Sequence, residues 1–190
     1  MTATPSLADA IDAAVAPLAT LPLLDLAREG GVLVLRLGVA GNGRTGRPVG
    51  PKGDGAWTLR VSCAWRLTSG DGILTGAGDL FTPADPDAEL EDFDWEAPDA
   101  SWLDVRLAAF HQALGGERVT VERAAGDRFG GLHLALSDGI ALEVFPESSD
   151  AEHVDSEFWR LGRGDAAGPG DIVVGSRGLE HEPDAQPPLA

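Results

Sequence analysis

Carboxylates dominate the residues of this chain that are able to do chemistry. From Asp79 to Asp104 the sequence carries ten Asp and Glu residues and no Lys or Arg. A second stretch, from Asp138 to Glu157, adds seven acidic residues, again without a basic one. So much negative charge has three possible uses: binding a metal ion, attracting a basic partner, or keeping the protein soluble.

The first acidic stretch matches a calcium-binding loop only in part. Laid on the twelve-residue EF-hand pattern, Asp85, Asp87, Glu89 and Glu96 occupy positions 1, 3, 5 and 12. However, Leu90 stands where the sharp turn requires glycine, and no amphipathic helix leads into the segment. The spacing therefore predicts no metal site.

The other reactive side chains form no recognisable catalytic set. The histidines His111, His133, His153 and His181 are scattered, and none has a zinc-type spacing. Cys63 falls inside the apolar run VSCAWRL, which favours a buried thiol over a nucleophile. We therefore predict no catalytic residue.

The segment GNGRTG formally matches the dinucleotide-binding pattern G-x-G-x-x-G at Gly41, Gly43 and Gly46. That pattern works when its last glycine opens a helix whose N-terminus holds a pyrophosphate. Here RPVGPKGDG follows, and its prolines and glycines cannot form a helix. The sequence thus indicates no cofactor.

The charge of the whole chain limits the class of partner. The formal net charge is -17, from 31 acidic residues against 14 Lys and Arg. Such a molecule repels nucleic acid and anionic lipid and attracts basic partners. The N-terminal apolar stretches are interrupted by Asp9, Asp12, Pro17 and Pro22, so neither a signal peptide nor a membrane helix is expected. A single cysteine fits the reducing cytoplasm.

The N-terminal 31 residues are predicted to form a helical segment. Ser6 and Asp9 have the spacing of a capping box, and Pro17 is expected to end the helix that they start. A second short helix is predicted from Pro22 to Gly30, because leucine, alanine and charged residues fill the interval.

Residues 32–180 are predicted to form one α+β domain with a mostly antiparallel sheet and one or two packed helices. The alternation in WTLRVSCAWRL predicts one long strand over 57–67, with ILTG returning as its hairpin partner. Ser101 and Asp104 cap a helix that ends at Gly115. Further strands are expected at 32–39, 118–124, 132–145, 157–161 and 171–175. The strand at 171–175 is expected to be the last in the chain, before a flexible tail at 181–190.

The turn SDG divides the stretch 132–145 into a hairpin whose register the side chains specify. A two-residue loop would mix apolar and polar side chains on each face. A three-residue loop with Gly139 in the left-handed conformation instead pairs Leu134 with Leu142 and sets His133 opposite Glu143. We predict the second register.

The sequence from Trp57 to Glu180 resembles small uncharacterised bacterial proteins that carry a terminal L-E-x-F-P-x-S-S … W-R-L pattern. The pieces that match are LEVFPESS at 142–149 and FWRL at 158–161. Some of these proteins look like the immunity members of toxin-immunity pairs, and the resemblance implies no catalytic residues. Within FWRL, we interpret Trp159 as a core residue and Arg160 as a partner of nearby acids, with partner binding as the alternative.

These observations predict a non-enzymatic cytosolic protein that binds a basic protein partner, in its more specific form an immunity-type inhibitor. Aromatic side chains interleave with the first acidic stretch and offer anchors to such a partner. The alternatives are a small-ligand or enzymatic domain with an unidentified pocket, and a subunit whose acidity serves only solubility. Whether the two acidic stretches lie on the same face of the folded protein is a question that the sequence leaves open. The predicted partner-binding residues are Asp85, Asp87, Glu89, Glu91, Asp92, Asp94, Trp95, Glu96, Glu147, Asp150, Glu152 and Asp155.

Overall fold

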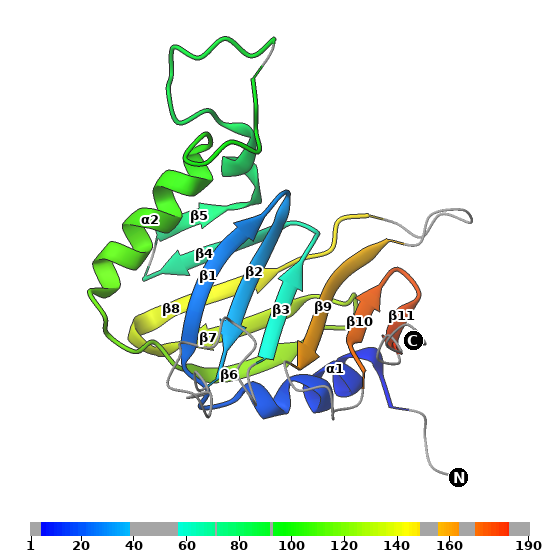
Figure 1. Cartoon of the computed structure of the whole chain (residues 1–190). Helices are drawn as coiled ribbons and strands as arrows, with labels where there is room; N and C mark the ends of the chain where they lie inside the picture. The colour runs from blue at the N-terminus through cyan, green and yellow to red at the C-terminus, as the bar shows by residue number, and fades with distance from the viewer. Residues whose placement is uncertain are drawn as a thin grey trace, which may run out of the picture.

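Two antiparallel β-sheets pack face to face, and a helix lies at each end of the pair (Figure 1). The computed structural model describes residues 5–38, 57–70, 72–91, 93–148, 156–163 and 170–182. The predicted α+β class with mostly antiparallel strands is confirmed. The loop 41–55, which contains GNGRTG, lies outside the described residues.

The first sheet has the strand order β1-β2-β3-β9-β10-β11, and the second has the order β5-β4-β8-β7-β6. The helices are α1 (Leu7–Val15) and α2 (Trp102–Leu114), with 3-10 turns η1 (Ala16–Leu18), η2 (Ala77–Phe81) and η3 (Ser137–Gly139). The strands are β1 (Leu23–Glu29), β2 (Val32–Leu37), β3 (Trp57–Val61), β4 (Trp65–Ser69), β5 (Gly72–Gly76), β6 (Val121–Gly126), β7 (Leu132–Leu136), β8 (Ile140–Val144), β9 (Glu157–Arg163), β10 (Ile172–Gly175) and β11 (Gly178–His181).

The core lies between the two sheets and is built from alternate residues of their strands. Leu33, Leu35 and Leu37 project inward from β2, and Leu134 and Leu142 meet them from the second sheet; all five are buried. Each buried leucine contributes about 2 kcal/mol relative to an exposed one. The period-2 pattern of the sequence thus becomes two apolar faces in contact.

The long strand predicted over 57–67 is wrong, because the chain changes sheets at Ser62–Ala64. β3 pairs with β2 and β9 in the first sheet, whereas β4 pairs with β5 and β8 in the second. The N–H groups of Ser62 and Cys63 both donate to the carbonyl of Phe158 at this corner. Alternation continues through the corner, so periodicity alone did not reveal it.

The N-terminal helix begins as predicted, with Ser6 and Asp9 forming a reciprocal capping box. The second predicted helix is wrong, since residues 23–29 form β1 and pair with β2. Gly30, at φ 59°, makes the hairpin turn between these strands rather than ending a helix. The helical propensity of LLDLARE is overridden by pairing with β2, so this segment belongs to the same body as residues 32–180.

The predicted register of the β7–β8 hairpin is confirmed. Leu134 pairs with Leu142 and His133 with Glu143, and Gly139 is left-handed with φ 69°. The neighbouring Asp138 is also left-handed.

Two details at the C-terminal end differ from prediction. The strand at 171–175 is not the last, because β11 follows and pairs with β10. His181 ends β11, and the N–H of Glu182 donates to the carbonyl of Asp171, so the predicted flexible tail does not begin at 181. Residues 183–190 lie outside the described part of the chain.

Helix α2 has the predicted ends, with Ser101 and Asp104 in a capping box and Gly115 left-handed at the C-cap. Within the described residues, no helix has the length and apolar character that a membrane crossing requires.

Candidate functional site

Residues 82–100 leave the body between η2 and α2 and extend away from both sheets (Figure 1). We call this segment the acidic protrusion. Its two ends are joined by backbone hydrogen bonds, from the Ala84 N–H to the Ala100 carbonyl at 2.8 Å and from the Trp102 N–H to the Thr82 carbonyl at 2.7 Å. These bonds close the base of the protrusion.

Two aspartates organise the backbone of the protrusion. A carboxylate oxygen of Asp85 accepts from the N–H of Asp87, and one of Asp94 accepts from the N–H of Glu96, each at 3.0 Å. These are Asx turns, in which the side chain replaces a backbone acceptor. Both side chains remain exposed while they serve the turns.

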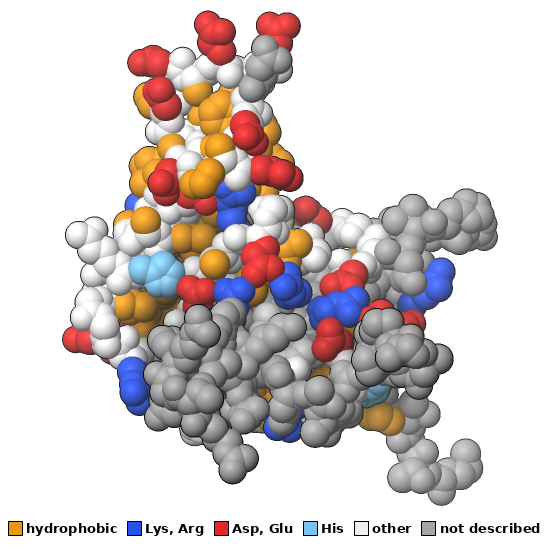
Figure 2. Space-filling view, in the orientation of Figure 1, with side chains coloured by type: hydrophobic (Ala, Val, Ile, Leu, Met, Phe, Trp, Pro, Cys, Tyr) orange, Lys and Arg blue, Asp and Glu red, His pale blue; other side chains and the backbone are white. Residues whose placement is uncertain are grey.

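An aromatic cluster of Phe81, Phe93 and Trp95 lies within this acidic surrounding. The ring centroids of Phe93 and Trp95 are 4.4 Å apart, and those of Phe81 and Trp95 are 6.3 Å apart. The side chains of Phe81 and Leu90 are 72% and 62% exposed. Figure 2 shows the result as an apolar patch surrounded by acidic side chains. Such patches with polar rims are typical of interaction surfaces.

The predicted acidic residues of the first stretch surround this cluster and are exposed. Among the residues that the structure describes, none of them forms an ion pair with Lys, Arg or His. Asp92 lies outside the described residues, and Trp95 belongs to the aromatic cluster. The exposed predicted residues are Asp85, Asp87, Glu89, Glu91, Asp94 and Glu96.

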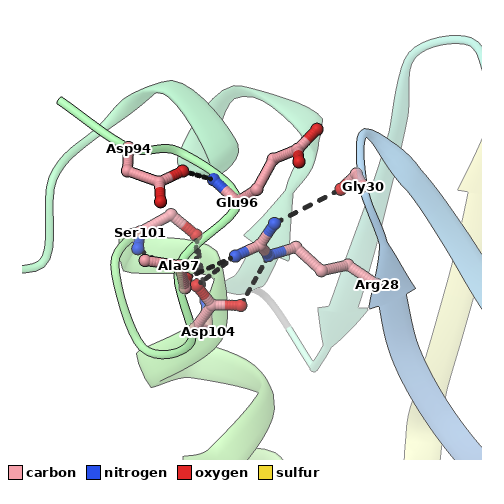
Figure 3. Close-up of polar contacts among 7 residues, drawn as sticks. All are labelled: Arg28, Gly30, Asp94, Glu96, Ala97, Ser101 and Asp104. Carbon is pink, nitrogen blue, oxygen red and sulfur yellow. Dashed lines mark hydrogen bonds and ion pairs between the residues drawn. The ribbon is translucent and has the colours of Figure 1, made fainter. Parts of the chain in front are cut away.

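Arg28 of β1 fixes the base of the protrusion to the body (Figure 3). Its Nε and Nη2 donate to the two carboxylate oxygens of Asp104 at 2.6 and 2.9 Å, and Nη2 also donates to the carbonyl of Ala97 at 3.1 Å. The side chains of Arg28 and Asp104 are only 9% and 13% exposed. A fork-shaped pair of this kind, shielded from solvent, is stronger than a surface ion pair.

The same Asp104 carboxylate closes the cap of α2. It accepts hydrogen bonds from the N–H and the hydroxyl of Ser101 at 3.0 and 2.9 Å. The hydrogen bond from Arg28 is the main reason that the pKa of Asp104 is lowered, and the bonds from Ser101 act in the same direction. One carboxylate therefore joins the helix start, the protrusion and β1.

Sequence reasoning missed Arg28 because its segment was predicted to be helical and separate. Asp104 was recognised as a cap, but nothing in the local sequence pointed to a partner 76 residues away. Phe81 was also missed, because it lies just before the segment in which the other aromatic residues were noticed.

The described acids of the second stretch are dispersed over the body instead of forming one surface with the first. Glu143 pairs with Arg66 on the second sheet, and Glu157 pairs with Arg160 on the first. Of the described acids in this stretch, Glu147 alone lies beside the protrusion, because it lines a cavity that Phe81 also lines. The predicted residues Asp150, Glu152 and Asp155 lie outside the described part of the chain.

The other side chains that could take part in chemistry, the cysteine and the histidines, form no catalytic or metal-binding group among the described residues. Cys63 is half-buried, and desolvation raises the pKa of its thiol to about 11, so the thiolate that a nucleophile requires is rare at neutral pH. His111 contacts the carbonyl of Leu26 at 2.8 Å. Among the described residues, no three His, Cys, Asp or Glu side chains converge as metal ligands.

The interpretation of FWRL as structural agrees with the coordinates. Trp159 is 0% exposed, and its Nε1 donates to the carbonyl of Gly130 at 2.8 Å. Arg160 binds Glu157, Asp171 and Glu182. Both side chains are therefore occupied within the protein.

Comparison of this chain with protein-family models, with curated proteins and with solved structures found no match.

Proposed function

We propose that this chain is a non-enzymatic binding protein whose acidic protrusion recognises a basic partner protein. The observation that carries the proposal is a partly exposed aromatic cluster surrounded by carboxylates without ion-pair partners among the described residues. In its more specific form, the chain is a cytosolic immunity-type inhibitor that covers a basic site on a toxin.

The two kinds of side chain on the protrusion have different roles in this proposal. The carboxylates act at long range, raising the association rate by steering a positively charged surface toward the protrusion. The aromatic cluster acts after contact, because burial of Phe81 and Trp95 slows dissociation. Affinity then depends on salt mainly through the association rate.

The attachment of the protrusion supports binding without a large loss of conformational entropy. Arg28 and the paired backbone at residues 84 and 100 hold the base in place before any partner arrives. A segment ordered in advance loses less freedom on association than a flexible one.

The product of the neighbouring gene is the first partner to test, because toxin and immunity genes act as pairs. Its association with the full chain is measured by stopped flow across a range of salt concentrations. Replacing three protrusion acids (Asp87→Asn, Glu89→Gln, Glu91→Gln) is expected to lower the association rate about tenfold at low salt and to flatten its salt dependence.

A matched control removes the same charge elsewhere. The variant Glu117→Gln, Glu122→Gln, Asp138→Asn changes three exposed acids outside the protrusion. It is expected to keep most of the wild-type rate. Equal rates for the two triple variants would contradict a role for the protrusion, and no association by the wild type would refute the immunity-type form.

A second candidate function, small-ligand binding, is favoured by one observation. The buried Oγ of Ser176 has no hydrogen-bond partner among the described residues, and it lines a hollow of about 440 Å³ with Arg128 and Phe129. Those groups suit an aromatic carboxylate. Calorimetric titration with benzoate tests this function: binding that Arg128→Ala abolishes would support it, and the absence of heat would count against it.

A further inference from the structure

A small cavity lies at the base of the acidic protrusion, and we call it the base cavity. Its volume is about 210 Å³. Its walls come from the start of β2, the corner between β3 and β4, η2 and the first turn of α2, and they include Leu33, Trp65, Leu80 and Leu103. Small-molecule sites occupy about 300–1,000 Å³, so this cavity has the size of a single side chain rather than of a ligand.

The polar groups inside the base cavity do not offer free charge to an occupant. Arg28 lines the cavity, but its guanidinium donates to Asp104 and to the carbonyls of Ala97 and Gly30. The Cys63 thiol also lines it and is protonated at neutral pH. An apolar side chain therefore enters without leaving a buried charge unpaired, whereas a lysine or arginine head group would meet an occupied Arg28.

The rim of the cavity has the opposite character. Phe81 lines the cavity and also belongs to the aromatic cluster, so the cavity and the apolar patch of the protrusion are continuous. Glu147, which is exposed, lines the cavity as well, and Figure 2 shows acidic side chains around the apolar surface of the protrusion. An apolar pocket inside an anionic rim has the layout of an interface hot spot, with a dry centre and a charged border.

We infer that the base cavity receives one apolar side chain, of about the size of leucine, that the partner presents between Lys or Arg residues. The inference rests on the proposed function and deepens it: the partner is recognised by an apolar residue flanked by positive charge, not by positive charge alone. The base cavity then supplies specificity, while the protrusion supplies the rate of encounter.

Two synthetic lysine-rich peptides test the inference with the full chain. They are identical except that one carries a central leucine and the other a central serine. Binding is followed by fluorescence anisotropy at low and moderate salt. We expect both peptides to bind in a salt-dependent way, with the leucine peptide binding about tenfold more tightly, because the cavity buries its apolar side chain.

Filling the cavity is expected to remove the preference for leucine. Gly31 lines the cavity, and a Cβ there would lie 3.9 Å from Leu80 Cδ2, so the Cβ of Gly31→Leu meets no clash and the rest of the side chain is expected to occupy the cavity. Gly78→Leu is the matched control, because Gly78 is in η2, has open space around it and does not line the cavity. Thermal unfolding of both variants verifies that they fold.

Cys63 gives a second measurement of occupancy, since it is the only cysteine in the chain. Its alkylation by iodoacetamide at mildly alkaline pH is followed by mass spectrometry. Saturating leucine peptide is expected to slow alkylation severalfold in the wild type and in Gly78→Leu, and saturating serine peptide is expected to have little effect. This measurement separates cavity filling from attraction to the protrusion.

The possible outcomes test the inference separately from the proposed function on which it rests. Salt-dependent binding of both peptides with equal affinity would overturn the inference and leave the proposed function standing. A leucine preference that Gly31→Leu leaves intact would also overturn the inference. If neither peptide binds the wild type, or if the three-acid protrusion variant binds as the wild type does, the proposed function itself fails.

Discussion

The outer face of the first sheet and the acidic protrusion both carry many carboxylates, but only the sheet neutralises them. On the sheet, Arg36 binds Asp25 and Glu29, each at 2.6 Å, and Arg60 binds Glu29 at 2.8 Å. Figure 2 shows basic and acidic side chains next to each other across the middle of the molecule. The described acids of the protrusion form no ion pair, and Arg28, the arginine at its base, binds Asp104 and the Ala97 carbonyl instead.

The strand register explains why the sheet needs its acids. Arg60 of β3 lies directly opposite Arg160 of β9, and like charges in that position destabilise a sheet. Glu29 binds Arg60, and Glu157 is one of the carboxylates that bind Arg160. These hydrogen bonds lower the pKa of Glu29, chiefly through Arg60, and raise the pKa of Arg160. The acidic side chains on this face therefore stabilise the sheet by offsetting the repulsion between its arginines.

The comparison shows that the number of acids in a stretch does not reveal their role. Glu157 belongs to a stretch with no Lys or Arg, yet Arg160 of the same strand, just beyond that stretch, binds it. What matters is whether an arginine reaches the carboxylate, either from the same strand or from another, as Arg60 of β3 reaches Glu29 of β1. The protrusion extends away from both sheets (Figure 1), and Arg28 at its base is already bound to Asp104 and to the Ala97 carbonyl.

The largest loss of stability is expected from a substitution of Arg28, which joins the first sheet to the protrusion. Arg28→Ala leaves Asp104, with its side chain largely buried, without its cation and frees the carbonyl of Ala97. We expect the free energy of unfolding to fall by about 3 kcal/mol, measured by chemical denaturation. The control Arg106→Ala removes an exposed arginine that lies over the Trp102 ring and should cost less than about 1 kcal/mol. Equal costs would mean that Arg28 does not anchor the protrusion.

A smaller effect is expected from the paired face of the first sheet. Arg160→Met keeps the apolar stem but leaves Glu157, Asp171 and Glu182 close together without a cation. The free energy of unfolding should fall by about 1 to 2 kcal/mol, and the deficit should shrink at high salt, which screens the repulsion between the carboxylates. A deficit that does not change with salt would argue for lost packing instead of charge.

Lowering the pH is expected to reduce the free energy of unfolding, because some carboxylates have pKa values that the fold lowers. Arg28 lowers the pKa of Asp104, and Arg66 lowers that of Glu143. Their stabilising contribution is complete above the unfolded values of 3.8 and 4.5 and is lost as the pH falls through the lower folded values. Denaturation curves from neutral pH down to about pH 3 measure this loss. Asp104→Asn should make the free energy of unfolding depend less steeply on pH between neutral pH and about pH 3. An unchanged dependence would show that Asp104 does not contribute to the acid sensitivity.

The smallest effect on stability is expected in the protrusion. The variant Asp87→Asn, Glu89→Gln, Glu91→Gln should change the free energy of unfolding by no more than about 0.5 kcal/mol, because these exposed side chains form no ion pairs among the described residues. Thermal and chemical unfolding give the value. A loss as large as that of Arg160→Met would end the distinction between paired and unpaired acids.

Local sequence was sufficient for the elements whose bonds lie within a few residues. Both capping boxes, the left-handed Gly115 and the β7–β8 register were predicted, because spacing along the chain determines which groups meet there. The acidic residues of the protrusion and Trp95 were predicted from the sequence as partner-binding residues, and that role stays a prediction. The exposure of the described acids follows from a polar segment too poor in apolar periodicity to join the core.

The tertiary structure alone decided where distant segments meet. It made 23–29 a strand, divided 57–67 between two sheets, placed Arg28 against Asp104, and set Glu147 and Phe81 at one cavity. These outcomes depend on which apolar faces pack together, and that choice brings charges into contact that lie far apart in the chain. Composition and periodicity carry no such distance, so which carboxylates are neutralised and which remain available to a partner is a property of the fold.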